Sequence, residues 1–148
     1  MKRILLYSLP VLLSFVIGCS PSHSNPTPAN IPEGTFAGQF ISLHLHEKTG
    51  VIDTAKANIQ LQMEESTGFK VTGDTSTLHA GSFGTYIFNS YNTAIDFMDK
   101  TSPVTGTPTK IHLNGIYAFF FDGTTLQMQT ASAFDTLSYI YILKKTGN

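Results

Sequence analysis

The sequence predicts an all-β domain of about eight or nine antiparallel strands. Residues 55–63 alternate apolar and polar side chains without a break, which is the period of a half-buried strand. Asp122-Gly123, between two apolar runs, is a strong signal for a β-hairpin. The chain after residue 32 has no long stretch with the apolar periodicity of a helix.

The first predicted strand changes phase along its length. Phe36 and Phe40 share one face, whereas Leu43 and Leu45 belong to the opposite phase. If all these apolar side chains face the core, the strand needs a bulge or sharp bend between Phe40 and Ile41, as barrel strands often have.

The remaining strands are apolar runs separated by turn residues. Glu47–Gly50 and Glu64–Gly68 are predicted turns, and Thr101–Pro108 is a loop rich in Pro, Gly and Thr. Ala131–Asp135 has room for one helical turn. The predicted strands are Val51–Met63, Phe69–Asp74, Thr85–Phe88, Ala94–Met98, Ile111–Phe121, Thr125–Thr130 and Leu137–Lys144.

Two strands are apolar on both faces, namely Ile116–Phe121 and Leu137–Leu143. One face of each strand is needed for the core. The other face is either covered by the end of the linker or a neighbouring loop, or it is an exposed apolar patch that marks an interaction site. The sequence leaves both alternatives open.

The first residues have the organisation of a signal peptide. Lys2 and Arg3 precede the apolar run Ile4–Ile17, which is too short for a membrane-spanning helix and contains Pro10. We therefore expect residues 1–18 to be a cleaved signal sequence. Cys19 follows this segment. In the alternative, the segment is an ordinary signal peptide and Cys19 is not modified.

Val16-Ile17-Gly18-Cys19 resembles the lipobox of bacterial lipoprotein precursors. The resemblance implies that Cys19 is acylated and becomes the first residue of the mature protein. Residues 19–32 then form the lipidated cysteine and a Pro-rich linker, and residues 33–148 form the domain. Ser20, rather than Asp, after the cysteine implies a cell-envelope location at the outer membrane more than at the inner membrane. A lipidated Cys19 leaves the domain without any thiol chemistry.

The charge balance excludes one class of partner. Nine Lys+Arg less Lys2 and Arg3 leaves seven, all lysine, against ten Asp+Glu, a net charge of −3. Without a basic patch, nucleic acid is not an expected partner.

Four motifs resemble, in this order, those of the lipocalin-like domains of small bacterial lipoproteins. They are Gly34-Thr35-Phe36, where lipocalins have Gly-x-Trp; Gly84-Thr85-Tyr86 followed by Ile95-Asp96-Phe97; Leu113-Asn114-Gly115-Ile116-Tyr117 followed by Asp122–Leu126; and Tyr141–Lys145. The resemblance implies an up-and-down antiparallel β-barrel over most of Gly34–Lys145.

A barrel of this size either fills its interior with side chains or holds one small ligand. The expected function is a non-enzymatic binding module for a small apolar ligand; the alternative is an interaction or structural subunit of an envelope complex that uses an exposed apolar sheet face. The residues expected to face inward and contact the ligand are Phe36, Phe40, Leu61, Val71, Tyr86, Phe97, Phe120, Met128 and Tyr141.

Catalytic and metal-binding patterns are weak. His44 and His46 share a strand face and would chelate a metal if His79, His112 or a carboxylate joined them. With Leu43 and Leu45 on the core face, however, both histidines are expected on the solvent side without a metal. The acidic pairs Glu64/Glu65 and Asp96/Asp99 indicate no catalytic cleft. We therefore expect no enzyme activity and no cofactor.

Overall fold

The computed structural model describes residues 31–89, 91–106, 108–132 and 136–147. The predicted signal sequence, Cys19 and the linker up to Asn30 lie outside the described residues. Within the described ranges, no helix has the length and apolar character needed to cross a bilayer.

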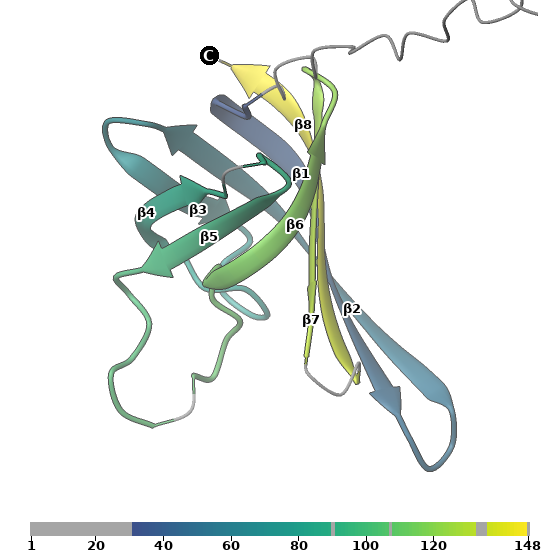
Figure 1. The fold of residues 1–148 in the computed structure, drawn as a ribbon. Helices are drawn as coiled ribbons and strands as arrows, with labels where there is room; N and C mark the ends of the chain where they lie inside the picture. Colours follow the sequence, from purple (N-terminus) through teal and green to yellow (C-terminus); the bar gives the residue numbers. More distant parts are fainter. Residues whose placement is uncertain (1–30, 90, 107, 133–135, 148) are drawn as a thin grey trace, which may run out of the picture.

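Eight strands close into a barrel in the order β1-β2-β3-β4-β5-β6-β7-β8, and every neighbouring pair is antiparallel (Figure 1). The predicted all-β, up-and-down architecture is confirmed. Of the predicted helical turn, Ala131 is the last residue of β7, and residues 133–135 lie outside the described ranges. The strands are β1 (Gly34–His46), β2 (Val51–Glu64), β3 (Gly68–Gly73), β4 (Phe83–Phe88), β5 (Ala94–Asp99), β6 (Gly115–Phe121), β7 (Thr125–Ala131) and β8 (Leu137–Gly147).

The predicted bulge between Phe40 and Ile41 is wrong. β1 pairs with β2 in unbroken register along its whole length, and its register shift against β8 lies between Thr35 and Phe36. Phe36, Phe40 and Ser42 are buried, so the even-numbered residues keep facing inward. Ile41, Leu43 and Leu45 consequently lie on the outer face, because the outer face of this part of the barrel is itself apolar.

β6 begins later than predicted. Gly115 has a φ of 89°, a conformation that interrupts an extended strand. Residues 111–114 therefore form a separate segment before the strand, and the only pairing of Ile111 is an isolated parallel bridge to His79.

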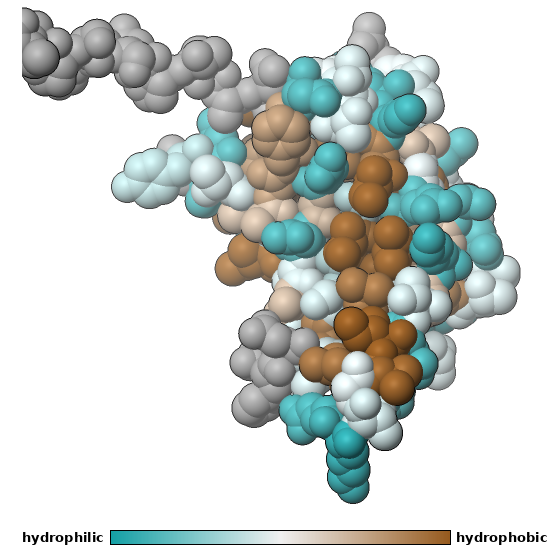
Figure 2. All heavy atoms as spheres, turned by 90° about the vertical axis from the view of Figure 1, so that its right-hand side faces the viewer, coloured by the Kyte–Doolittle hydropathy of each residue, from teal (hydrophilic) through white to brown (hydrophobic). Residues whose placement is uncertain are grey.

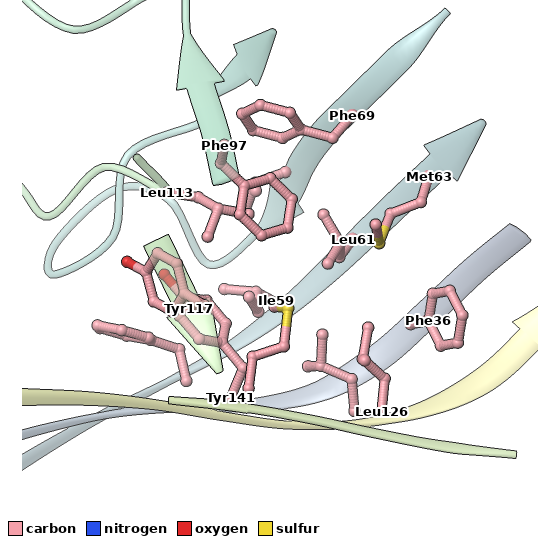
Figure 3. Packing of buried hydrophobic residues seen from close by; sticks show 14 of the residues in the cluster. Phe36, Ile59, Leu61, Met63, Phe69, Phe97, Leu113, Tyr117, Leu126 and Tyr141 are labelled. Atoms are coloured by element: carbon pink, nitrogen blue, oxygen red, sulfur yellow. The ribbon is translucent and has the colours of Figure 1, made fainter. Parts of the chain in front are cut away.

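The barrel interior is a continuous aromatic and aliphatic core (Figure 3). Aromatic rings on β1, β8, β6, β5 and β3 contact one another in series across the interior. Ring centroids are 4.9 Å apart for Phe40 and Tyr141, 5.6 Å for Tyr141 and Tyr117, 5.8 Å for Tyr117 and Phe97, and 5.0 Å for Phe97 and Phe69. These contacts connect five strands across the interior.

The weakest part of the barrel wall is the β3–β4 pairing. Only two residue pairs join these strands, Phe69 with Gly84 and Lys70 with Phe83. Beyond them, residues 78–82 and 111–113 lie side by side, joined by Ala80 N–H to Ile111 O at 2.9 Å and Ile111 N–H to Leu78 O at 3.0 Å. We call these two segments the plug, because the side chains of His79 and Leu113 are buried in the barrel interior.

Candidate functional site

Most of the residues predicted to contact a ligand do face the interior. Phe36, Phe40, Leu61, Val71, Phe97, Met128 and Tyr141 are buried, and Tyr86 is partly buried against them. The prediction for Phe120 is wrong, because its side chain is 62% exposed. The alternation of β6 turns Tyr117, Phe119 and Phe121 inward and Phe120 outward.

The interior set does not border open space in this conformation. The seven fully inward members, from Phe36 to Tyr141, are at most 2% exposed. A cavity large enough for water would leave its lining side chains accessible, so side chains fill the region between these residues. Leu113 from the plug contributes to the filling and lies close to Phe97 and Tyr117 in Figure 3.

One polar side chain from the plug lies within this apolar interior. His79 is fully buried, with its ring 4.8 Å from that of Phe40. Its Nδ1 donates to Ala80 O at 2.6 Å, and its Nε2 accepts a hydrogen bond from the Tyr141 hydroxyl at 2.8 Å. Burial lowers the pKa of His79, so this arrangement holds a neutral imidazole.

The tyrosines around His79 are also neutral. Burial raises the pKa of Tyr141 well above its ordinary value and that of Tyr117 to about 12. Burial likewise raises the pKa of Tyr139. The hydroxyl of Tyr141 can therefore act as the donor to His79 over the whole physiological range of pH.

A second buried pair ties the plug to β5. Asp99 Oδ2 lies 2.6 Å from His112 Nδ1, and its Oδ1 accepts bonds from Thr101 N–H at 2.8 Å and from the Thr101 hydroxyl at 2.7 Å. Burial alone would raise the pKa of Asp99, but the bonds from Thr101 and His112 outweigh burial and lower it. The backbone N–H of Asp99 also donates to Asn114 Oδ1 at 3.0 Å.

The predicted metal ligands do not come together, because His44 and His46 lie away from His79 and His112. His44 and His46 are exposed with ring centroids 4.7 Å apart, and His46 Nε2 lies 2.7 Å from Asp53 Oδ2. His79 and His112 are held in the plug by the bonds described above. In the described part of the chain, no group of three or more His, Cys, Asp or Glu is arranged to hold a metal ion.

Neither of the two acidic pairs forms a catalytic cleft in the described structure. Glu64 and Glu65 are exposed at the β2–β3 turn, whereas Asp99 is enclosed by Thr101 and His112. Asp96 points to the other side of β5 and is half-buried.

The most distinctive surface is the outer side of four adjacent strands, which we call the outer apolar face. Figure 2 shows a continuous hydrophobic band on this side of the molecule. Ile116 is 65% exposed, Phe120 62% and Ile142 45%. The face consists of Ile116, Ala118 and Phe120 on β6; Gln127, Gln129 and Ala131 on β7; Ser138, Ile140 and Ile142 on β8; and Gln39, Ile41 and Leu43 on β1.

Strand register aligns these side chains in rows. One row runs through Phe120, Gln127, Ile142 and Gln39, and the next runs through Ala118, Gln129, Ile140 and Ile41. Neither row contains a charged residue. Charges begin at the borders, with Asp96 opposite Ile116 and Lys56 opposite Ile41. The arrangement is an uncharged, mainly apolar surface with amides at its centre.

Two hollows of about 240 and 400 Å³ lie on the outer apolar face. The smaller hollow is bordered by Phe120 and Gln127, and the larger one by Leu43 and Ser138. Both are lined by Ala118, Gln129 and Ile140, so they lie next to each other on β6, β7 and β8. None of the described residues covers Ile116, Phe120 or Ile142. The predicted alternative, a cover formed by the end of the linker, concerns residues up to Asn30, which lie outside the described ranges.

Comparison with models of known protein families, with curated proteins and with solved structures gave no match in any of the three.

Proposed function

We propose that this protein is a non-enzymatic lipoprotein of the cell envelope whose barrel docks onto a protein partner. The observation that carries the proposal is the outer apolar face, where Ile116, Phe120 and Ile142 are exposed in uncharged surroundings. Protein interfaces have this character at their centre, where charged residues are depleted and aromatic residues enriched. Contiguous apolar patches on soluble domains mark interaction sites.

The proposed anchor makes the bilayer a poor explanation for this face. Two or three acyl chains on Cys19 would hold the protein at the membrane, because each buried CH₂ contributes about 0.8 kcal/mol. A Pro-rich segment in extended form gains about 3.1 Å per residue, so the proposed linker would let the barrel reach roughly 40 Å from the bilayer. Because the lipid would already supply membrane attachment, the outer apolar face is not needed for it and is free for a protein partner.

The docking surface can be tested in cells with a photo-crosslinking amino acid. We expect a covalent adduct with a partner when the probe replaces Phe120 or Ile142. The matched control is Ile87 on β4, which is 56% exposed but lies outside the outer apolar face. Adducts of equal yield at Ile87, or none at the two test positions, would contradict the proposal.

The anchor is tested in the same cells. Cys19→Ser removes the sulfur that carries the lipid, so the variant is expected to move from the membrane to the soluble fraction. Its crosslink yield at Phe120 should fall, because the partner is then no longer held at the same surface. A Cys19→Ser variant that stays in the membrane fraction would contradict acylation at this residue.

Uptake of a small apolar molecule by the barrel is a second candidate function. The observations that favour it are the two-pair β3–β4 pairing and the plug, whose segments have no strand ladder and place His79 in the interior. Loops open at lower free-energy cost than paired strands. The predicted ligand residues Phe40 and Tyr141 contact the plug through His79, so they are the ones that its movement would uncover.

A further inference from the structure

The plug is joined to itself and to the barrel by few bonds. Apart from the two backbone bonds between residues 78–80 and Ile111, Leu113 N–H donates to Ser82 Oγ at 3.2 Å. Ser82 O accepts from Val71 N–H of β3 at 2.7 Å. The link from the middle of segment 78–82 into the barrel wall is the bond between His79 and Tyr141 of β8.

The direction of that bond depends on the protonation state of His79. Nδ1 already donates to Ala80 O, so the neutral ring offers Nε2 as its acceptor to the Tyr141 hydroxyl. A proton on Nε2 turns this acceptor into a donor, so that the Tyr141 oxygen must accept instead, and it places a positive charge in a buried apolar interior next to Phe40.

We propose that the plug is an acid-operated gate, in which protonation of His79 releases residues 78–82 from the barrel and uncovers the aromatic interior. The groups that face His79 from the surrounding elements are Tyr141 of β8, Tyr117 of β6, Asp99 of β5 and His112 of the second plug segment. The ring of Tyr139 of β8 lies 5.8 Å from that of Phe40, which contacts His79.

None of these groups stabilises a proton on His79 enough to keep the gate closed. The three tyrosines remain neutral in acid. Burial lowers the pKa of His79 more than the bond to Ala80 O and the charge of Asp99 raise it, and His112 lowers it further. Asp99 is committed to Thr101 and His112, so acid leaves segment 111–113 attached to β5 while segment 78–82 moves.

The size of the response follows from proton linkage. An imidazole released to solvent returns to its ordinary pKa of 6.5, while the buried ring resists protonation. Below that pH, the open state binds one proton more than the closed state. The opening constant of the gate therefore rises by up to about tenfold for each unit by which the pH falls below 6.5.

Hydrogen exchange read by mass spectrometry on the acylated protein in detergent tests the gate. After correction for the intrinsic exchange rate, the amides of Ala80 and Ile111 are expected to exchange at least about tenfold faster at pH 5.0 than at pH 7.5. Amides in the β1–β8 ladder should not change. His79→Gln, which carries no titratable ring, should lose the pH response, and His46→Gln, at an exposed histidine, should keep it.

Tyr141→Phe provides a second variant that retains His79. It removes the hydroxyl that donates to Nε2, so the gate should open roughly three- to tenfold more at pH 7.5. The proposal is overturned if the wild-type amides show no response down to pH 4.5. It is equally overturned if His79→Gln responds like the wild type, or if the β1–β8 ladder opens together with the plug.

Discussion

Two aspartate–histidine pairs show how burial determines the contribution of a contact to the stability of the fold. Asp99 and His112 are 2.6 Å apart with the aspartate side chain sealed from solvent, whereas Asp53 and His46 are 2.7 Å apart with the aspartate side chain 69% exposed. The lengths are nearly the same, but only Asp99 has additional donors from Thr101. Solvent screens the exposed pair and leaves the buried one at full strength.

We expect Asp99→Asn to lower the free energy of unfolding by about 2 kcal/mol, because it removes a buried charged acceptor from three hydrogen bonds. Asp53→Asn should change it by about 0.5 kcal/mol or less. Urea unfolding at pH 7 measures both values. Equal losses of unfolding free energy in the two variants would show that the buried pair stabilises the fold no more than the exposed pair.

The same residue predicts the acid limb of stability. The pKa of Asp99 is lowered in the folded state from the ordinary 3.8, so the unfolded chain binds the proton more readily. The stabilisation is therefore complete only well above pH 3.8 and is lost as the pH falls through the folded-state pKa. In Asp99→Asn this part of the pH dependence should be absent.

At the scale of the element, β6 shows what alternation can and cannot predict. All side chains from Ile116 to Phe121 are apolar, so the strand sequence alone gives no inward phase. Its neighbour does, because Leu126 and Met128 alternate with glutamines, and Phe121 lies opposite Leu126. Residues opposite each other in an antiparallel pair share a face. The Asp122-Gly123 hairpin therefore contained the information that assigns Tyr117 inward and Phe120 outward.

Two aromatic residues of β6 should respond in opposite ways. Tyr117→Ala removes a ring that is 1% exposed and in contact with Phe97 and Tyr141, so it should cost about 3 kcal/mol or more of unfolding free energy. Phe120→Ala removes an exposed ring and should change stability by about 0.5 kcal/mol or less. Thermal and urea unfolding provide the comparison. A large loss in Phe120→Ala would mean that the outer apolar face is covered within the monomer.

β1 illustrates a different limit. Its bulge was predicted on the assumption that every apolar side chain belongs to the core. Ile41 and Leu43 instead extend an apolar surface on the outside, and Gly38 lets the strand approach β8 closely, since a Cβ there would collide with the backbone oxygen of Ile142. Hydrophobic patterning identifies a face but does not say whether that face is inside.

At the scale of the whole molecule, the strand order was predictable because hairpin connections pair consecutive strands. The closed barrel was predicted from the resemblance to lipocalin-like domains. The plug was not, because residues 78–82 and 111–113 are distant in sequence and carry no pairing pattern. His79 appeared in the sequence only as a possible metal ligand. Its place beside Tyr141 depends on how the barrel closes.

Uptake by the whole barrel is the test of the second candidate function. If the interior accepts an apolar molecule once the plug moves, a fluorescent fatty acid should bind saturably at pH 5.0 and more weakly at pH 7.5. Phe40→Ala, at a buried ring beside His79, should alter this binding, and Ile87→Ala should not. No saturable binding at either pH would leave the barrel with a purely structural interior.

The pairing of β1 has a mechanical consequence for a tethered domain. The chain enters the barrel through β1, which is joined to β2 by 13 residue pairs and to β8 by 10. A pull along the linker would load both ladders in shear, so that many hydrogen bonds resist together instead of breaking one after another. The two-pair seam between β3 and β4 lies outside this load path. Tension from the tether thus acts where the barrel is strongest, and the seam stays free to open.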